Sequence, residues 1–473
     1  MKKMISTFIV GFLIIGGFAT VPIFGKNQSL KEFDIFDKYD MVIIAPDQFS
    51  STLQPLIDHK NNYNIRTFLK TTEEIYDEYG GRDNAEQIKY FIKDAAETFE
   101  ISYVFIIGDI NLVPMRKTAV TVLTTAIIWT EILTDLYYAD INNADGSFSS
   151  WDTNNNNVFG ECNYGYYNLE STIPPDPKII DHVDLHPDIG MGRLPCSTNY
   201  DVQNITNNII FYESETCGCD WFNNIILMGG DTEPLEGNGL LEGEQVELTI
   251  EQEMIKHGFK NVKLFTSLGT FNLESILNEI NNGAGFVSYS GHGNTEYIAT
   301  YPKNESNFIS CRIIDIKDLR NANKRPIFFL DACQTGKFDN NRFDGGLLSV
   351  FPFCIVKLLL EKTFDLETFP CFAWSLIKSQ SGGGIATIAS SSPTWFGYEY
   401  NSDQLEILYG SNIFHQLFFE AYKPGIILSD MFQQAQNSYI EKMQSPNSML
   451  WDRNTVDGFN LIGDPSLKIG GYE

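Results

Sequence analysis

Two stretches decide the fold: Gly285-Phe-Val-Ser-Tyr-Ser-Gly-His292-Gly293 and Pro326-Ile-Phe-Phe-Leu-Asp-Ala-Cys333-Gln-Thr-Gly336. In each, a short apolar run typical of a buried strand leads directly into a reactive side chain beside glycine. Ligands bind at the carboxyl ends of the strands in an open parallel sheet. We therefore expect His292 and Cys333 to lie at one edge of the sheet, provided that their strands are neighbours.

Similar apolar runs occur on both sides of residue 216, with stretches of helical spacing between them. They are Asp40–Pro46, Ile65–Leu69, Tyr103–Ile107, Asn223–Gly230, Asn261–Phe265 and Gly384–Ala389. Alternating strands and helices predict an α/β fold, in which an open, mostly parallel sheet carries helices on both faces. We expect a smaller α/β subdomain over residues 26–215, with a long loop from 142 to 187, and a second subdomain over 216–473.

The composition is that of an acidic globular protein. Of 473 residues, 43% are hydrophobic and 20% are charged, which argues against disorder. Acidic residues number 61 and basic residues 33, which gives a net charge of −28. Such a chain repels a phosphate backbone, so nucleic acid is excluded as a general partner. The charges are spread along the chain, as on a solvated surface.

The first 25 residues are typical of an export signal. Lys2 and Lys3 precede a largely apolar run that ends near Gly25. The run is also just long enough to anchor the chain if it is retained. We expect a secreted protein, cleaved near residue 25, that makes no stable membrane association once the leader is removed.

A cysteine and a histidine placed together can perform nucleophilic catalysis. The Cys333 thiolate would attack a carbonyl carbon, and His292 would accept the thiol proton and later give a proton to the leaving amine. The backbone amides of Gly293 and Cys333 could form an oxyanion hole. A buried structural cysteine or a hydrogen-bonded structural histidine is the ordinary interpretation of either residue alone. Their joint placement at two strand ends favours catalysis.

The pattern of an apolar strand ending in His-Gly and a second ending in Asp-Ala-Cys resembles the caspase–gingipain–legumain clan of cysteine peptidases. The histidine lies 41 residues before Cys333, which is closer than in caspases, and the sequence looks more like the gingipain-type (C25) peptidases. Further stretches carry this resemblance. They are Phe105–Asp109, Asp135–Asp140, Gly190–Pro195, Gly229–Asp231, Cys371–Trp374 and Leu461–Ser466.

The resemblance implies a caspase-like catalytic subdomain and endopeptidase activity, with Cys333 as nucleophile and His292 as general base and acid. It also implies export and protein or peptide substrates, and we expect a monomer. In the family an acid orients the histidine. Asp231, Glu242 and Glu244 are candidates, and Asp231 is preferred because it follows a predicted strand and two glycines.

The substrate pocket is less evident from the sequence. Ser391 and Trp395 follow the strand that ends at Ala389 and could form its walls, although an ordinary packed tryptophan is as consistent with the pattern.

An Asn-rich segment is predicted to bind structural calcium, as members of the resembled family do. Its oxygen ligands would be Asp152, Asn154, Asn156, the carbonyl of Val158, and Glu161. The spacing is not that of an EF-hand, and only two of the ligands are charged, so the affinity would be weak. An Asn-rich turn without an ion is the alternative. No catalytic metal is expected.

Two alternatives to a secreted endopeptidase remain open. One is a catalytically silent relative that binds peptides or cell-surface partners. The other is a transpeptidase or ligase that uses the same Cys–His pair, because an amine can capture an acyl-thioester in place of water. Motifs for nucleotide binding, zinc proteases and serine hydrolases are absent from the sequence.

Overall fold

The computed structural model describes residues 38–123, 127–168, 171–173, 181–233, 241–339, 370–401, 404–443 and 450–473. The predicted leader, residues 1–25, lies outside the described residues. Residues Lys38–Glu473 form one compact unit, and all that follows concerns this unit. Within the described residues, no helix combines the length and apolar character that crossing a bilayer requires.

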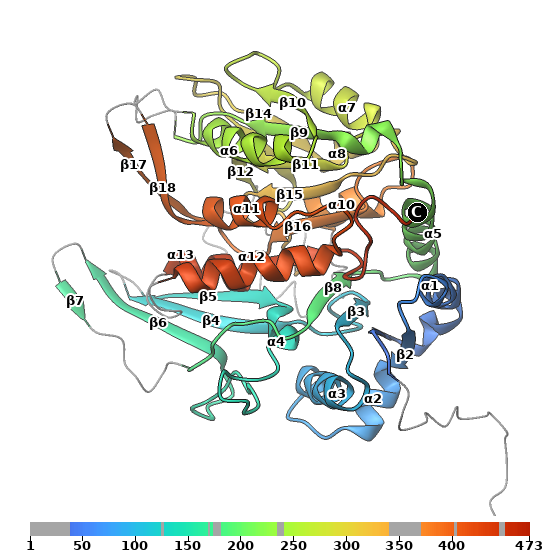
Figure 1. Ribbon diagram of the computed structural model, residues 1–473. Helices are drawn as coiled ribbons and strands as arrows, with labels where there is room; N and C mark the ends of the chain where they lie inside the picture. Colours follow the sequence, from blue (N-terminus) through green and yellow to red (C-terminus); the bar gives the residue numbers. More distant parts are fainter. Residues whose placement is uncertain are drawn as a thin grey trace, which may run out of the picture. The chain divides into compact units, whose positions relative to one another are not determined.

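A ten-stranded sheet runs through the whole unit (Figure 1). In spatial order its strands are β10 (Lys260–Phe265), β9 (Asn224–Gly229), β11 (Phe286–Ser290), β15 (Ile327–Asp331), β16 (Ala386–Ser390), β19 (Phe459–Ile462), β8 (Gly190–Leu194), β3 (Tyr103–Ile107), β1 (Met41–Ala45) and β2 (Thr67–Thr71). Neighbouring strands run parallel except β16 and β19, which are antiparallel. Most of these strands are apolar along their whole length, because both faces of the sheet are covered.

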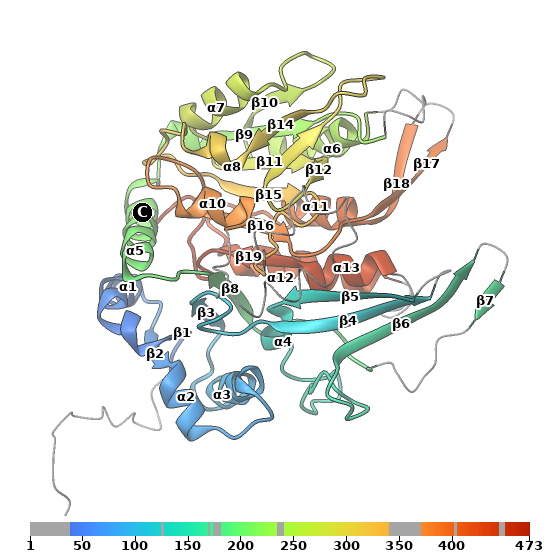
Figure 2. The ribbon, with the colours of Figure 1, turned by 180° about the vertical axis from the view of Figure 1, so that it is seen from behind.

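Helices cover both faces of this sheet, which confirms the predicted fold class. In Figure 1, α6 (Glu242–Lys256), α11 (Ser411–Glu420) and α12 (Leu428–Lys442) lie in front of it. Figure 2 shows α8 (Ile313–Ile316) and α10 (Phe372–Lys378) on the opposite face. The other helices are α1 (Ser50–Asn62), α2 (Thr72–Glu78), α3 (Asn84–Phe99), α4 (Leu136–Ala139), α5 (Asn199–Glu215), α7 (Leu273–Asn282) and α13 (Leu450–Gly458).

Three smaller sheets accompany the main one. The first contains β12 (His292–Gly293), β13 (Tyr297–Thr300) and β14 (Ile309–Arg312), and the second is the pair β17 (Phe396–Asn401) and β18 (Gln404–Gly410). The third has the order β5 (Ile127–Thr134), β4 (Arg116–Leu123), β6 (Phe159–Asn168) and β7 (Ser171–Ile173). The first of these sheets begins with the predicted catalytic histidine.

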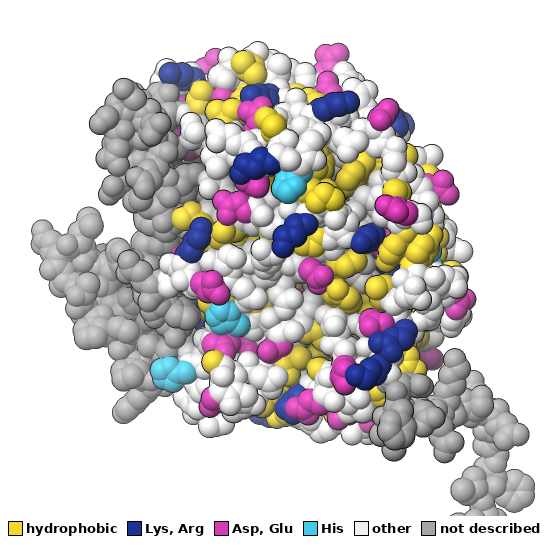
Figure 3. Space-filling model, in the orientation of Figure 1, with side chains coloured by type: hydrophobic (Ala, Val, Ile, Leu, Met, Phe, Trp, Pro, Cys, Tyr) yellow, Lys and Arg dark blue, Asp and Glu magenta, His cyan; other side chains and the backbone are white. Residues whose placement is uncertain are grey.

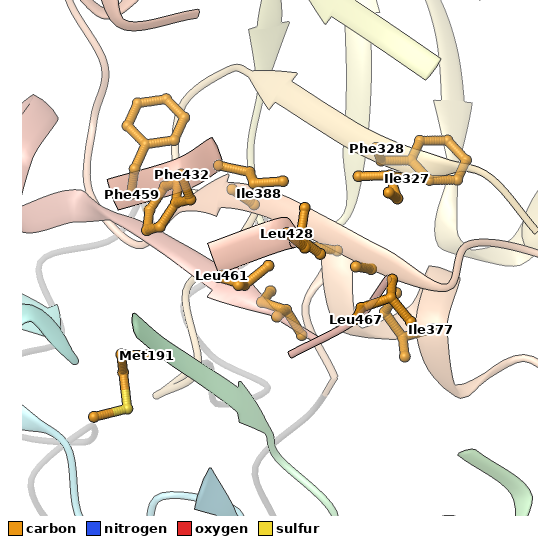
Figure 4. Close-up of a cluster of buried hydrophobic side chains, with 14 of the residues drawn as sticks. Met191, Ile327, Phe328, Ile377, Ile388, Leu428, Phe432, Phe459, Leu461 and Leu467 are labelled. Carbon is orange, nitrogen blue, oxygen red and sulfur yellow. The ribbon is translucent and has the colours of Figure 1, made fainter. Parts of the chain in front are cut away.

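The C-terminal strand β19 joins the two predicted subdomains. It pairs with β16 on one side and with β8 on the other, so the sheet continues across the boundary near residue 216. Figure 4 shows Leu461 of β19 in one cluster with Ile388 of β16, Leu428 of α12 and Met191 of β8. The two halves thus share a hydrophobic core, and their division into subdomains stays a prediction.

The surface mixes both charge signs. Figure 3 shows basic and acidic side chains interspersed over the described part of one face. This agrees with the expectation, drawn from the even spread of charge along the chain, that the excess acid is a solvated surface.

Candidate active site

The predicted cysteine and histidine follow two neighbouring strands. Strands β11 and β15 are parallel partners, with Ser290 opposite Asp331 at their carboxyl ends. His292 lies two residues beyond Ser290, and Cys333 lies two residues beyond Asp331. The condition that their strands are neighbours is therefore met, and the sheet register brings the two residues to the same edge.

A tight turn presents Cys333 at the end of β15. The next residue, Gln334, has a φ of 54°, which is a left-handed conformation that few non-glycine residues adopt. The Gln334 amide donates to the Ser392 carbonyl at 3.0 Å, and the Gly336 amide donates to the Ser390 carbonyl at 2.8 Å. These bonds fasten the turn to the end of β16. They offset the cost of the left-handed residue, about 1–2 kcal/mol, and leave the Cys333 side chain half-buried.

Thr394 contacts the thiol directly. The Thr394 amide lies 3.3 Å from Cys333 Sγ, and its carbonyl oxygen and hydroxyl each lie 3.6 Å from the sulfur. An amide N–H aimed at sulfur favours the thiolate, whereas a carbonyl oxygen accepts from the thiol. Thr394 therefore contacts the Cys333 thiol directly. It is not among the site residues predicted from the sequence.

Gly293 allows the histidine strand to approach the cysteine turn. A Cβ atom on Gly293 would lie 2.8 Å from Ala332 Cβ and 2.8 Å from Thr335 Cγ2, and 3.3 Å from the Cys333 carbonyl oxygen. The first two separations are shorter than real Cβ contacts. Only glycine permits this approach, which places the backbone beside His292 against the turn of the nucleophile. The roles of the Gly293 and Cys333 amides in an oxyanion hole stay a prediction.

A backbone carbonyl orients the His292 ring. His292 is exposed, and its Nε2 lies 2.7 Å from the carbonyl oxygen of Thr232. A carbonyl oxygen can only accept a hydrogen bond, so Nε2 must carry the proton. In the neutral ring this leaves the lone pair on Nδ1, which makes Nδ1 the atom able to accept a proton.

Thr232 is itself held by the start of helix α6. The Thr232 amide and hydroxyl donate to Glu242 Oε2 at 3.2 and 3.1 Å, and Glu242 is fully buried in the first turn of the helix. A carboxylate at a helix N-terminus is favoured by the helix dipole. The chain of contacts from Glu242 through Thr232 to His292 orients the ring, and within the described part of the chain the ring contact is with a backbone carbonyl.

The other acidic candidates have other partners. Asp231 Oδ1 accepts from the Glu233 amide at 2.9 Å, and Asp231 forms a backbone bridge with Tyr301. Glu244 accepts from Thr266 and Ser267. Asp231 does lie at the predicted edge of the sheet, but the ring contact that the structure shows is with its neighbour Thr232. Direct orientation of His292 by Asp231 stays a prediction.

The two predicted pocket residues differ in their surroundings. Ser391 is buried, and its hydroxyl donates to the Leu133 carbonyl at 2.6 Å, so it ties β16 to β5. Trp395 directly follows Thr394, and its side chain is 51% exposed. The exposed Trp395 indole is free to contact a bound molecule, whereas the Ser391 hydroxyl is already engaged.

The comparisons with known proteins agree with this geometry. Residues 35–470 match the model of peptidase family C25. The chain belongs to this family. It is 23% identical over 441 residues to gingipain R2 of Porphyromonas gingivalis strain W83, which covers 91% of this chain and 46% of the relative. The identity to gingipain R1 of the same organism is also 23%, over 91% of this chain and 34% of the relative.

Two solved structures show the same fold. The Arg specific cysteine proteinase gingipain R matches with a TM-score of 0.59 and 18% identity, over 94% of this chain and 80% of that structure. The complex of Porphyromonas gingivalis RgpB pro- and mature domains also matches with a TM-score of 0.59 and 18% identity, over 91% and 79%. The chain spans less than half the length of the two gingipain sequences above.

The predicted calcium loop of this C25 chain is tied by internal contacts. Its proposed ligands are Asp152, Asn154, Asn156, Val158 and Glu161. The Arg82 guanidinium pairs with Asp152, the Asn156 amide donates to the same carboxylate at 3.0 Å, and the Asn156 side-chain amide donates to Glu161 at 2.9 Å. Within the described ranges, no three or more His, Cys, Asp or Glu side chains come together in a way that could hold a metal ion. In this arrangement Arg82 supplies the positive charge beside Asp152, so a calcium ion would have to displace it, and calcium binding stays a prediction.

The contact between His292 and Thr232 predicts the tautomer of the histidine. We expect neutral His292 to carry its proton on Nε2. Long-range ¹H–¹⁵N NMR of ¹⁵N-histidine-labelled protein would measure this tautomer. Glu242→Ala frees Thr232, so the fraction of the Nε2–H tautomer should fall. Glu244→Ala removes another buried carboxylate from the same turn of α6, two residues further along, and should leave the fraction of the Nε2–H tautomer unchanged. A proton on Nδ1 in the unmodified protein would contradict the assignment.

Proposed function

We propose that this chain is a secreted cysteine endopeptidase. The observation that carries the proposal is the convergence of four neighbouring strand ends. Beyond the carboxyl ends of β9, β11, β15 and β16, which are consecutive in the sheet, come Thr232, His292, Cys333 and Thr394 respectively. The first orients the base, the second is the base, the third is the nucleophile and the fourth contacts it. Membership of peptidase family C25 supports the same conclusion.

The proposed reaction follows from these positions. The thiol proton passes to Nδ1 of His292, and Cys333 Sγ forms a bond to the carbonyl carbon of the scissile peptide. When the tetrahedral intermediate collapses, the C–N bond breaks and His292 gives its proton to the leaving amine. Water, activated by the same nitrogen, then hydrolyses the thioester. The Nε2–H bond to Thr232 stabilises the ring in both of its protonation states.

The substrates would be proteins or peptides, and Trp395 is the residue we propose as a wall of their binding site. Its exposed indole offers a large apolar face one residue after Thr394, which contacts Cys333. Secretion is proposed from the sequence of the first 25 residues and from the resemblance to gingipains. A monomer remains the expected state.

Calcium binding by the Asp152 loop is a separate proposal. Calcium would have to displace Arg82 from Asp152, so the affinity should be weak in the natural sequence. We expect Arg82→Gln to enlarge the rise in thermal midpoint that calcium produces, relative to the unchanged protein, as measured by differential scanning fluorimetry with calcium or EGTA. Lys93→Gln, which removes a surface ion pair with Glu97, is the control. Identical midpoints with calcium and EGTA in both the natural protein and Arg82→Gln would contradict the proposal.

The endopeptidase proposal is tested with the purified mature protein and a peptide library that varies the residue before the scissile bond. We expect cleavage by the natural sequence and a loss of about 10⁶-fold in turnover for Cys333→Ala, as is common when a nucleophile is removed. Cys217→Ala, which removes an exposed cysteine, should retain full activity. Products are identified by mass spectrometry.

The same experiment separates the alternatives. Product masses that equal two hydrolysed fragments indicate a peptidase, whereas rejoined peptides indicate a transpeptidase or ligase. Cleavage that survives in Cys333→Ala would contradict the assignment of the nucleophile. Binding of peptides without any product would favour the catalytically silent relative.

A further inference from the structure

A buried polar cluster lies beneath the candidate active site, between the sheet and helices α6 and α11. It consists of Ser288 on β11, Asp331 on β15, His415 on α11 and Glu247 on α6. All four residues are buried, and three of them are titratable. None of them belongs to the catalytic contacts described above. A group of this kind inside a hydrophobic layer requires a physical account, because buried polar groups destabilise the fold unless they satisfy one another.

His415 is the centre of the cluster. Its Nε2 lies 2.8 Å from Ser288 Oγ, and its Nδ1 lies 3.7 Å from Asp331 Oδ2. The imidazole stacks on the ring of Phe329 with centroids 4.2 Å apart and planes inclined by 8°. The sheet register explains these contacts. Ser288 pairs with Phe329, and Ser290 pairs with Asp331. The side chains of these four strand residues therefore point to the sheet face that α11 covers.

The protonation states follow from burial. Burial lowers the pKa of His415, an effect that Asp331 opposes, so the ring is neutral at physiological pH. Burial raises the pKa of Glu247 well above its ordinary value, which the Ser288 hydroxyl opposes and the charge of Asp331 reinforces, so the protonated form of Glu247 is favoured. Among the described residues, neither Glu247 oxygen has a hydrogen-bond partner at standard distance.

The protonation state of His415 decides which of its ring nitrogens donates and which accepts. The Nδ1–H of His415 faces the Asp331 carboxylate, and the Nε2 lone pair accepts from the Ser288 hydroxyl. The neutral histidine thus accepts a hydrogen bond from Ser288 on β11 and faces the Asp331 carboxylate on β15 at 3.7 Å, which is beyond hydrogen-bond distance. An apolar side chain could make neither polar contact.

The two linked strands are those that carry the catalytic residues. Asp331 lies two residues before Cys333, and its backbone carbonyl accepts from the amide of Gly291, the residue before His292, at 3.2 Å. Asp331 thus touches the catalytic histidine strand through its main chain and α11 through its side chain. Any shift of Asp331 would move Cys333 relative to His292.

We propose that His415 is a positioning residue, which ties Ser288 to Asp331 beneath the sheet and thereby fixes Cys333 against His292. The proposal rests on the proposed function, because it assigns the cluster a role in that reaction. His415 does not touch substrate, and it acts through the two strand ends. Buried polar networks of this kind hold one arrangement of the elements they join.

The test compares His415→Phe with Phe418→Leu. His415→Phe keeps an aromatic ring over Phe329 but leaves Ser288 and Asp331 without their partner. Phe418→Leu is the matched control, because Phe418 lies on the same helix, is fully buried and also packs on Phe329, at 5.1 Å. We expect kcat for peptide cleavage to fall at least tenfold in His415→Phe with KM within twofold, and to stay within twofold in Phe418→Leu.

Ser288→Ala is the second variant, which removes one atom and is expected to fold. It should lower kcat in the same direction, and the double variant with His415→Phe should lose no more than the larger single loss, because both act through one network. Unchanged kcat in Ser288→Ala and His415→Phe would overturn the proposal. An equal loss in Phe418→Leu would also overturn it, since packing alone would then explain the effect.

A second readout separates this proposal from the proposed function. The rate at which iodoacetamide alkylates Cys333, followed by peptide mass mapping, needs no substrate. If the natural protein cleaves no peptide, the proposed function fails, and the alkylation rates still decide the role of His415. We expect a fall of at least fivefold in His415→Phe and Ser288→Ala and no change in Phe418→Leu. Equal rates in all four proteins would overturn the proposal.

Discussion

The parallel pairing of β11 with β15 is the constraint on which the site depends. Hydrogen bonds between the two strands set Ser290 opposite Asp331, and the chain needs only two further residues on each strand to reach His292 and Cys333. A shift of one residue in this register would turn the side chains of one strand to the other face. It would separate the thiol from the imidazole.

The rest of the site is added by the strands on either side. Strand β9 leads to Thr232, whose carbonyl fixes the tautomer of His292, and β16 leads to Thr394, which contacts the thiol. Helix α6 contributes to two parts of this arrangement, because Glu242 in its first turn holds Thr232, and Glu247 lies in the cluster around His415. The site is therefore built at the ends of strands of one sheet. Thr232 and Thr394 make polar contacts at these strand ends, and the cluster around His415 lies on the sheet face that α6 and α11 cover.

The sequence predicted those parts of the fold and site that depend on local pattern. The apolar runs predicted the parallel sheet, and a strand leading into His292 and another into Cys333 predicted the edge where both lie. Thr232 and Thr394 were not predicted, because a backbone carbonyl and a backbone amide have no signature in residue type. Their signal was positional, because Thr232 follows β9 and Thr394 follows β16, the two strands that flank β11 and β15 in the sheet.

Long-range contacts were beyond local pattern. The spacing of oxygen-bearing residues in the loop at Asp152 predicted an ion site, but it could not show that Arg82, 70 residues earlier in the chain, places its positive charge beside Asp152. His415 lies 127 residues from Ser288, and its spacing along α11 resembles that of any core residue. Likewise, the sequence could not show that β19 returns from the end of the chain to join the two halves, because strand order depends on tertiary packing.

The adjacency of Cys333 and His292 is the central claim, and cross-linking of the unchanged protein tests it most directly. The reagent 1,3-dibromoacetone joins a thiol to an imidazole that lies beside it, and peptide mapping identifies the joined residues. The account predicts a single bridge from Cys333 Sγ to Nδ1 of His292, and only singly alkylated Cys333 in His292→Ala. A bridge from Cys333 to a different residue, or none in the unchanged protein, would contradict it.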